Sequence, residues 1–325
     1  MKTCLLHERT FARLKDRLEE TAGDMRFALL HDDGTVRDGR TGEDIDAPNP
    51  TLAYGNGDIW FGPSARPFFK LIMSSPELDW FQSSAAGVDN QALASVLAKA
   101  RLYTTNHKQA EAMAEWAIWQ ALDWLKRGQE HRANQKNAVW QRLQQREIMG
   151  ARWLIIGYGS IGQAVARRVT ALGGEAVGVR RSGGSDPHAT MIVTPHAVMS
   201  ELPKADIVLL CMPHTPETEN YADADFFAAM SENKTLFMNL GRGALVDEAA
   251  LIAELDRGRP AHAVLDVTAT EPLPEASPLW RHPNITITPH DSSETHGTLL
   301  RGDETFYENL QLYLKDEPLM HLISG

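Results

Sequence analysis

The chain has 325 residues, of which 43% are hydrophobic and 23% charged, with two cysteines and a formal net charge of −11. This length suits two domains, and the acidic balance argues against general binding to nucleic acid or to an anionic membrane surface. The cysteines show no paired spacing, which argues against a disulfide framework and a cysteine-based metal site. With neither a signal-peptide pattern nor an apolar run of membrane-spanning length, we expect a soluble cytoplasmic protein without a metal.

Short apolar runs alternate with helical patterns in the first hundred residues, which indicates βαβ units and a parallel sheet. A stretch rich in Asp, Gly and Pro interrupts this alternation and is typical of a loop or hairpin. The expected elements are a strand over 3–7, a helix over 9–20, a strand over 25–31, a loop or hairpin over 32–50, a strand over 57–62, a helix over 68–76 and a strand over 78–90.

Residues 109–127 predict a long helix of strong helix formers, which Gly128 is placed to end. Its apolar surface is unusually wide, so we expect it to be buried on more than one side, between domains or between subunits of a homodimer. The following segment is polar, with one isolated tryptophan, Trp140. The apolar residues of the helix are Met113, Trp116, Ile118, Trp119, Leu122, Trp124 and Leu125.

Strand and helix alternate more clearly after residue 151, and a further amphipathic helix is expected over 299–314. Most of the intervening segments are long enough to be crossover connections of a parallel sheet. The six strand-like runs are "ARWLIIG", "EAVGV", "ADIVLLCM", "TLFMNLG", "HAVLDV" and "ITITP".

The first of these runs continues into a G-x-G-x-x-G turn formed by Gly157, Gly159 and Gly162. This spacing, between a strand and a helix, is typical of a dinucleotide site. The three glycines would permit the tight turn, the approach of the backbone to a pyrophosphate and close helix–strand packing. The N–H groups near Ser160 and Ile161, at the start of the helix, would face the phosphate oxygens. A plain strand–turn–helix is the alternative.

The end of the second strand lacks the carboxylate with which NAD-binding proteins hold the ribose 2′-hydroxyl. Glu175 stands at the start of that strand, while Arg180, Arg181 and Ser182 stand at its exit. Guanidinium and hydroxyl groups suit a 2′-phosphate. The sequence therefore favours NADP over NAD, unless the two arginines simply lie in solvent on a surface loop.

Three side chains with complementary chemistry follow later strands. Arg242 stands between two glycines just beyond a strand end, Glu271 follows the strand that ends near Asp266, and His290 follows the last strand. Strand carboxyl ends bind ligands in open parallel sheets, and an arginine, a carboxylate and an imidazole together can bind an anion and move a proton. Each also has a structural explanation: Arg242 could pair with Asp247, for example.

These motifs and their order resemble the D-isomer-specific 2-hydroxyacid dehydrogenases, in particular the NADP-preferring glyoxylate/hydroxypyruvate reductase branch. The matching stretches are "GYGSIG", "CMPHTPET", "NLGRGALVDEAAL", "LDVTATEPLP" and "ITPH", together with "LDWFQSSAAGVDN" and "EAMAEWAIWQAL". The resemblance runs from about residue 75 to the end and is only an outline before that. Where the family's coenzyme domain has its ribose acid, this chain has Arg180.

The resemblance implies an α/β protein with a Rossmann-type dinucleotide-binding domain over 105–292 and a flavodoxin-like substrate domain over 1–104, completed by 293–325. Hinges are then expected near 105–108 and 292–295. The implied activity is the NADP(H)-dependent reduction of a small 2-oxo acid such as glyoxylate or hydroxypyruvate, or the reverse oxidation, with NAD(H) as the alternative coenzyme. A non-catalytic NAD(P)H-binding protein of the corepressor type is the alternative function, because it could keep the same residues.

The resemblance also implies a role for each site residue. Arg242 would bind the substrate carboxylate and carbonyl oxygen, His290 would donate the proton during reduction, and Glu271 would orient His290 and favour its protonated form. The remaining implied contacts are the backbone at Ala86, Gly87 and Val88 with the substrate carboxylate, Asp266 and the backbone at Leu240 and Gly241 with the nicotinamide carboxamide, and Met212 and Pro213 along the coenzyme groove.

Overall fold

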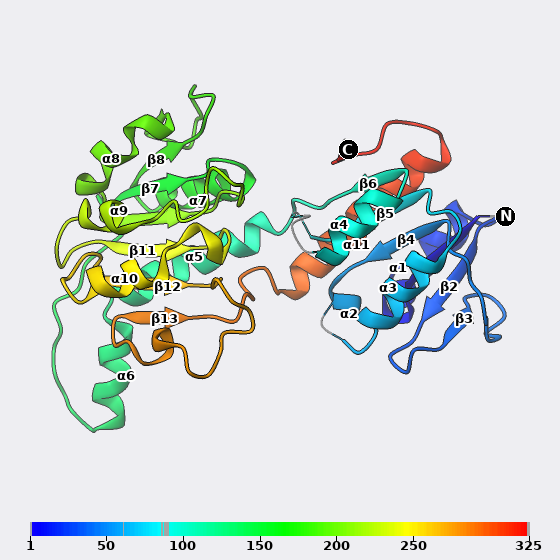
Figure 1. Ribbon diagram of the computed structural model, residues 1–325, viewed down its shortest axis with the longest axis horizontal. Helices are drawn as coiled ribbons and strands as arrows, with labels where there is room; N and C mark the ends of the chain where they lie inside the picture. Colours follow the sequence, from blue (N-terminus) through cyan, green and yellow to red (C-terminus); the bar gives the residue numbers. More distant parts are fainter. Residues whose placement is uncertain (1, 61, 86, 88–90, 324–325) are drawn as a thin grey trace. The chain divides into compact units, whose positions relative to one another are not determined.

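A computed structural model describes residues 2–60, 62–85, 87 and 91–323. The chain forms two compact units (Figure 1). The first combines Met1–Gln109 with Glu294–Gly325, and the second is Ala110–Ser293. Because the last residues of the chain return to the first unit, that unit is built from two separate stretches of sequence.

The first unit is built on a six-stranded sheet in the order β3-β2-β1-β4-β5-β6. Its neighbouring strands run parallel except β3, which pairs antiparallel with β2 and forms the hairpin that the sequence indicated. The strands are β1 (Thr3–His7), β2 (Arg26–Leu30), β3 (Val36–Asp38), β4 (Leu52–Gly55), β5 (Trp80–Ser83) and β6 (Leu102–Thr104).

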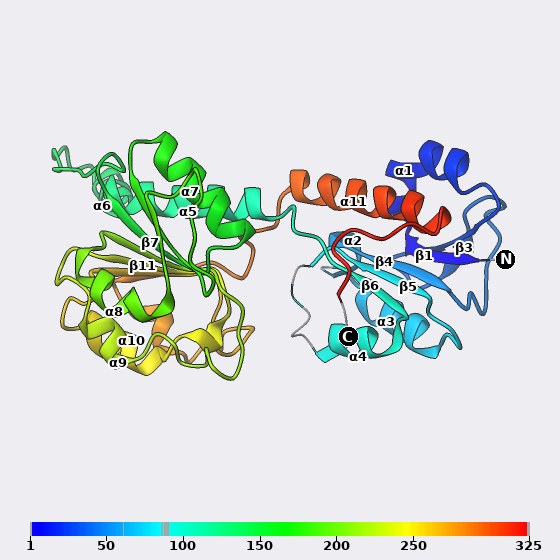
Figure 2. The same ribbon diagram turned by 90° about the horizontal axis from the view of Figure 1, so that it is seen from above.

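Helices cover both faces of this sheet (Figure 2). On one face, α1 (Glu8–Thr21) and α11 (His296–Leu314) bury residues such as Leu14 and Phe306 against the strands. On the other face, α3 (Ala65–Ser74) and α4 (Gln91–Lys99) bury residues such as Phe68. This arrangement is the flavodoxin-like doubly wound layering that the resemblance implied.

The prediction of a strand over 57–62 was wrong. The strand is Leu52–Gly55, and Gly57–Trp60 forms the short helix α2. Asn56 starts this helix, because its carbonyl oxygen accepts from the N–H of Ile59 at 2.9 Å and its side chain accepts from the N–H of Asp58 at 3.2 Å. Trp60 folds back over Gly55, where an added Cβ would meet its ring at 2.2 Å. A short apolar run can form either a strand or a helix, and here tertiary packing determined that it forms a helix.

The second unit is built on a seven-stranded parallel sheet in the order β13-β12-β11-β10-β7-β8-β9. The six expected strands are present, and β9 at the edge is a further strand that the sequence did not indicate. The strands are β7 (Arg152–Ile156), β8 (Glu175–Val179), β9 (Met191–Val193), β10 (Ile207–Leu210), β11 (Leu236–Asn239), β12 (His262–Leu265) and β13 (Ile285–Ile287).

Apolar clusters lie on both faces of this sheet as well. The long helix α5 (Ala110–Leu125) and α7 (Ser160–Ala171) share one cluster with the sheet, and α9 (Ala224–Ala228) and α10 (Glu248–Leu255) share the other. The expected Rossmann-type α/β fold is thereby confirmed. The remaining helices of the unit are α6 (Gly128–Lys136), α8 (Val198–Glu201) and the short 3₁₀ helices η1 (Pro195–Ala197), η2 (Leu202–Lys204), η3 (Gly243–Leu245) and η4 (Pro278–Arg281).

Gly128 does not end the long helix as expected. The left-handed residue at that point is Arg127, with φ 55°, and Gly128 begins α6. A Cβ at Gly128 would lie 2.0 Å from the Oδ1 atom of Asp123, so the glycine relieves a close side-chain contact.

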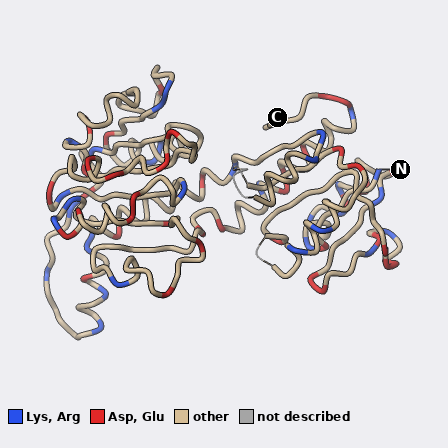
Figure 3. The backbone as a smooth tube through the Cα atoms, viewed as in Figure 1, with Lys and Arg blue, Asp and Glu red and all other residues tan. Residues whose placement is uncertain are grey.

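Charged residues of both signs are interspersed along the backbone of each unit (Figure 3). Among the described helices, none is both long enough and apolar enough to cross a bilayer.

Candidate active site

The candidate residues of the second unit follow the carboxyl ends of six neighbouring strands, and Met212 and Pro213 are the ones that follow β10. The glycine turn follows β7, the arginine pair follows β8, and the segments with Arg242, Asp266 and His290 follow β11, β12 and β13. All these strands are parallel, so their carboxyl ends meet along one edge of the sheet. In such sheets ligands bind at this edge, where the strand order reverses, and here the reversal lies between β7 and β10.

Two of the three glycines in the glycine turn, Gly157 and Gly162, have no room for a side chain. Gly157 has φ 104°, and a Cβ there would lie 2.5 Å from the backbone nitrogen of Met212. A Cβ at Gly162 would lie 2.7 Å from the carbonyl oxygen of Gly157, whereas one at the exposed Gly159 would meet no atom within 4 Å. Gly159 precedes α7 without a capping side chain, so the N–H groups of the first turn remain available to an anion. These features fit a pyrophosphate.

The two arginines after β8 have different surroundings. Arg180 is half-buried and donates to the carbonyl oxygens of Gly183 and Ser185 within its own loop, at 2.5 and 3.4 Å. Arg181 and Ser182 are exposed. At the end of β8, Arg181 and Ser182 therefore face solvent more than Arg180 does.

The segment after β11 is held by a fully buried asparagine. The Asn239 side chain accepts from the N–H of Gly241 and donates to the carbonyl oxygen of Arg242, both at 2.9 Å. A Cβ at Gly243 would lie 1.9 Å from the carbonyl carbon of Thr268, so the backbone of this segment packs directly against the segment after β12. The half-buried Arg242 is thus carried on a tightly restrained turn. Leu240 is buried, while Met212 and Pro213 after β10 are half-buried and exposed.

Asp266 is buried and organises the loop that carries the histidine. Its carboxylate accepts from the hydroxyl of Thr288 at 2.5 Å and from the N–H groups of Asp291 and Ser292 at 3.1 and 3.3 Å. Its backbone carbonyl accepts from the N–H of His290 at 2.8 Å. The described structure therefore gives Asp266 a bracing function, in addition to the contact with a nicotinamide that the resemblance implies.

Glu271 and His290 lie in direct contact although they are far apart in the sequence. Glu271 Oε2 accepts from Nδ1 of His290 at 2.8 Å, and Oε1 accepts from the N–H of Thr268 at 3.1 Å. With Nδ1 donating to the carboxylate, Nε2 is the ring atom available to a ligand, and it has no hydrogen bond within the described residues. Both side chains are partly exposed, 47% for the histidine and 39% for the glutamate.

The surrounding charges favour the imidazolium–carboxylate form of this pair. The hydrogen bond to Glu271 raises the pKa of His290, against the opposing effect of burial. Burial alone would raise the pKa of Glu271, but the hydrogen bonds from His290 and from the Thr268 N–H hold it below its usual range. The nearby positive charge of Arg242 lowers the pKa of both groups, so the three side chains influence one another electrostatically.

The backbone at His290 is left-handed, with φ 56°. This conformation is uncommon for a residue other than glycine, and such strain is concentrated at functional sites. It persists here because the neighbouring Asp291 and Ser292 N–H groups and the His290 N–H itself are all bound to Asp266.

The expected substrate loop lies in the first unit, after β5. Ala86 and Val88 lie outside the described residues, and Gly87 is half-buried. The described start of the loop is held by the N–H of Ala85, which donates to the Ser83 hydroxyl at 3.1 Å.

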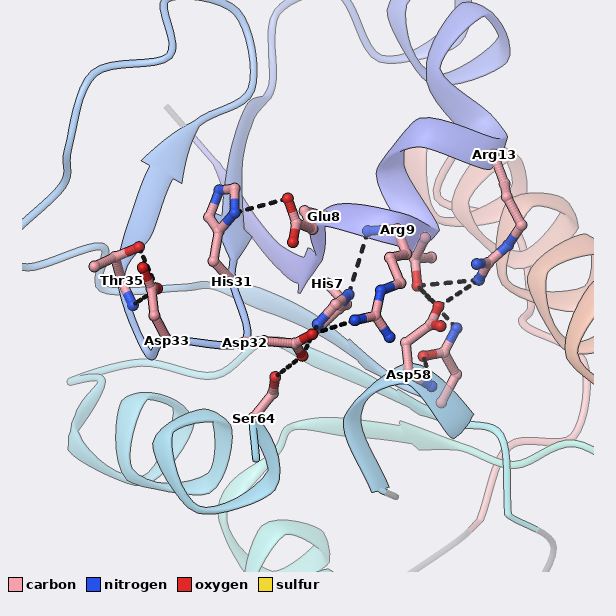
Figure 4. Close-up of polar contacts among 12 residues, drawn as sticks. His7, Glu8, Arg9, Arg13, His31, Asp32, Asp33, Thr35, Asp58 and Ser64 are labelled. Atoms are coloured by element: carbon pink, nitrogen blue, oxygen red, sulfur yellow. Dashed lines mark hydrogen bonds and ion pairs between the residues drawn. The ribbon is translucent and has the colours of Figure 1, made fainter. Parts of the chain in front are cut away.

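A separate polar cluster lies at the carboxyl ends of β1 and β2 in the first unit (Figure 4). His7 bonds Asp32 at 3.1 Å and caps α1 by accepting from the N–H of Arg9, and Ser64 donates to Asp32. Since these groups form hydrogen bonds with one another, we interpret the cluster as a structural one that holds the loops together.

Arg13 holds the next part of the same cluster. It bonds Asp58 and Asp303, each at 2.6 Å, and both carboxylates are almost completely buried. Asp303 also accepts from the Tyr54 hydroxyl and the Asn56 amide. This ion triad joins α1 to α2 and to α11, so it links the two sequence stretches of the unit.

A cavity of about 380 Å³ lies at the opposite, amino end of the second unit's sheet, beside the junction of α5 and α6. Several of its polar side chains bond one another, as His262 and Gln129 do through the Thr286 hydroxyl at 2.9 and 2.8 Å. Burial lowers the pKa of His262 to about 4, so this imidazole is neutral at pH 7. The cavity contains none of the candidate residues.

Sequence reasoning missed several residues that position the site. Asn239 and Thr288 were visible only as polar residues at the ends of apolar runs, a weak signal without the tertiary partners. Tyr158 and Asp186 were also missed, and the tyrosine hydroxyl donates to the aspartate at 3.0 Å. No set of three His, Cys, Asp or Glu side chains in the described part of the chain is arranged to hold a metal ion.

Comparison with known proteins identifies related sequences and structures. A glyoxylate/hydroxypyruvate reductase A from Serratia proteamaculans is 32% identical over 196 residues, which are 57% of this chain and 59% of that protein. The chain thus matches this curated relative over little more than half of the relative's length. A D-isomer specific 2-hydroxyacid dehydrogenase family protein from Aeromonas salmonicida has a similar structure, with a TM-score of 0.79, 26% identity and 99% of each chain covered.

A third similar protein is an NADPH-dependent glyoxylate/hydroxypyruvate reductase from Sinorhizobium meliloti, whose structure contains NADP and sulfate. It shares 23% identity and a TM-score of 0.77 over 100% of this chain and 98% of its own, which shows a common fold. The family described as D-isomer specific 2-hydroxyacid dehydrogenase, NAD binding domain, matches residues 118–292, more than half of the chain. The protein therefore belongs to the D-isomer specific 2-hydroxyacid dehydrogenases.

Proposed function

We propose that the protein is an NADP(H)-preferring D-2-hydroxyacid dehydrogenase that reduces small 2-oxo acids of the glyoxylate or hydroxypyruvate type. The observation that carries this proposal is the 2.8 Å bond between Glu271 and His290, which leaves Nε2 of the imidazole open beside the charge of Arg242. Family membership and the similarity to a curated glyoxylate/hydroxypyruvate reductase A support the substrate class.

The coenzyme would lie along the carboxyl edge of the second unit's sheet. The N–H groups of Ser160, Ile161 and Gly162 would hold the pyrophosphate, because the open space over Gly159 lets the phosphates approach the backbone. Met212 and Pro213 would line the groove, and Asp266 with the backbone of Leu240 and Gly241 would hold the carboxamide. When bound, the nicotinamide supplies or accepts the hydride.

The preference for NADP(H) would come from the exit of β8. Arg181 and Ser182 are exposed there and can bind a 2′-phosphate, while Arg180 stabilises the loop that presents them. The strand ends without a carboxylate in the position that would accept from a ribose 2′-hydroxyl. NAD(H) would bind more weakly for lack of this phosphate contact.

The chain's own residues would divide the remaining work. Arg242, with the backbone at Ala86, Gly87 and Val88, would bind the carboxylate of the 2-oxo acid. The guanidinium would also stabilise the negative charge that develops on the carbonyl oxygen during reduction. His290 would deliver a proton to that oxygen from Nε2, and Glu271 would keep the imidazole oriented and charged until then.

Steady-state kinetics on a panel of 2-oxo acids with NADPH and NADH would test this proposal. We expect turnover of glyoxylate or hydroxypyruvate and a higher kcat/KM with NADPH. Dinucleotide binding without turnover of any acid in the panel would instead support the corepressor-type alternative.

We further propose that the protein forms a homodimer through α5 and the segment after α6. Trp119 on α5 is 57% exposed, and Trp140 is 98% exposed on a segment that leaves the packed body of the second unit (Figure 1). Leu122, Val139 and Met149 add further exposed apolar surface. We infer that these residues form one apolar surface, because exposed apolar surfaces are typical of an interface, and a second copy would offer the same surface in return.

Molecular mass in solution would test the dimer. We expect twice the 36.0 kDa chain mass from light scattering, and a shift toward the single-chain mass for Trp119→Glu. Trp280→Glu is the matched control, because Trp280 is also half-exposed but lies in η4. A monomeric wild-type protein would contradict the proposal.

A further inference from the structure

Tyr158, the second residue of the glycine turn, connects two separate parts of the second unit. Its N–H donates to the carbonyl oxygen of Val179, at the end of β8, at 2.9 Å. Its hydroxyl donates to Oδ1 of Asp186, in the loop between β8 and β9, at 3.0 Å. One residue thus joins the turn that would hold the pyrophosphate to the loop that would hold the 2′-phosphate.

The position of the tyrosine ring is set by packing. The residue is 4% exposed, and the ring lies against β8 at Gly178, where an added Cβ would meet the ring at 2.3 Å. The glycine therefore makes room for the ring. Burial, together with the bond to Asp186, raises the pKa of Tyr158, so the phenol stays protonated and remains a donor at neutral pH.

The loop that receives this hydrogen bond is internally braced. Asp186 also accepts from the N–H of His188 at 2.9 Å, and Arg180 donates to the carbonyl oxygens of Gly183 and Ser185. Gly183 and Gly184 have φ of 57° and 101°, so the loop turns sharply between its two anchors. The exposed residues carried between these anchors include Arg181 and Ser182.

We propose that the hydrogen bond between Tyr158 and Asp186 is a latch that positions Arg181 and Ser182 for the 2′-phosphate of NADP(H). The latch rests on the proposed NADP(H) preference and adds to it two residues that touch no coenzyme. Tyr158 and Asp186 are positioning residues, and the negative charge of Asp186 is not needed for the role. Its oxygen acts as an acceptor that holds the loop against the glycine turn.

Four variants of the full-length protein test the latch: Tyr158→Phe, Asp186→Ala, the double variant and Asp186→Asn. The Phe variant keeps the packed ring and loses only the hydroxyl, and the Asn variant keeps an acceptor oxygen while losing the charge. Equilibrium titration of each protein with NADPH and with NADH, followed by nucleotide fluorescence, gives the two dissociation constants. Thermal unfolding without nucleotide identifies any variant that is misfolded.

Loss of one hydrogen bond changes an equilibrium by roughly 3- to 10-fold. We expect Tyr158→Phe and Asp186→Ala each to weaken NADPH by this factor and NADH by less than twofold, with kcat at saturating NADPH almost unchanged. The double variant should match Asp186→Ala, because that change already removes the bond to Tyr158, together with the acceptor of the His188 N–H. Asp186→Asn should retain the wild-type NADPH affinity within twofold. If the role of Asp186 required its negative charge, this variant would instead lose NADPH affinity as Asp186→Ala does.

Two results would overturn the latch while leaving the proposed function intact. One is unchanged NADPH affinity in both Tyr158→Phe and Asp186→Ala. The other is an Asp186→Asn variant that loses affinity mainly for NADH, since Asp186 would then bind the ribose hydroxyl directly. A wild-type protein that binds neither nucleotide, or that prefers NADH, would overturn the proposed coenzyme preference and the latch together.

Discussion

Replacing His290 with asparagine tests the proposed proton donor without disturbing its loop. His290 has φ 56°, a conformation that costs alanine roughly 1–2 kcal/mol but that asparagine adopts readily. Alanine would therefore combine the loss of the imidazole with a backbone shift. Asparagine keeps the loop in place, because the bond from the residue 290 N–H to the Asp266 carbonyl at 2.8 Å involves only the backbone.

The size of the expected effect follows from which interactions are lost. The variant lacks the group whose Nε2 would protonate the carbonyl oxygen, and general acid catalysis contributes about 10²- to 10⁴-fold to a rate, or about 3–5 kcal/mol of the barrier. The charge of Arg242 remains, so turnover should persist at a low level. Nucleotide affinity should stay within about twofold of the wild type, because the imidazole bonds Glu271 and no group of the glycine turn.

The assay is the rate of NADPH oxidation with saturating hydroxypyruvate or glyoxylate, paired with a fluorescence titration of NADPH. His196→Asn is a matched control, since it changes an exposed histidine of the same unit in η1. A variant that binds NADPH normally and turns over within about threefold of the wild type would refute the assignment of His290 as the proton donor.

Three further outcomes are expected. Glu271→Gln removes the carboxylate that raises the pKa of His290. Reduction needs the protonated imidazole, so activity falls as the pH rises through this pKa. In the kcat/KM profile of the variant, the fall should therefore begin at a lower pH than in the wild type. Gly159→Ala should leave the melting temperature without nucleotide unchanged, because the added methyl meets nothing within 4 Å, but should weaken NADPH binding by about tenfold or more in a titration. Arg13→Ala leaves two buried carboxylates without their counter-ion and should lower the urea-unfolding free energy by about 3–5 kcal/mol. Arg17→Ala, which breaks an exposed pair on the same helix, should cost about 0–1 kcal/mol, and equal losses for the two variants would show that burial of the triad has no energetic weight.

The described site separates the groups that could act on a substrate from the groups that hold them. Asn239 and Asp266 are buried, and their side chains form hydrogen bonds with the backbone around Arg242 and His290. Such buried, fully bonded partners restrict the positions of the exposed side chains, which is the preorganisation that catalysis by charge and proton transfer requires.

The sequence by itself determined the doubly wound α/β fold, the glycine turn and the family. These features depend on local periodicity, on the spacing of Gly157, Gly159 and Gly162, and on the order of short motifs, all of which are present in the chain before it folds. The parallel strands of the second unit were predictable for the same reason, because each is a short, nearly continuous apolar run.

Only the tertiary structure decided which side chains meet. The contact of Glu271 with His290 and the left-handed backbone at residue 290 arise from packing between segments that no local pattern connects. The strand at Leu52–Gly55 was decided in the same way, because a four-residue apolar run can be strand or helix until a neighbouring strand pairs with it.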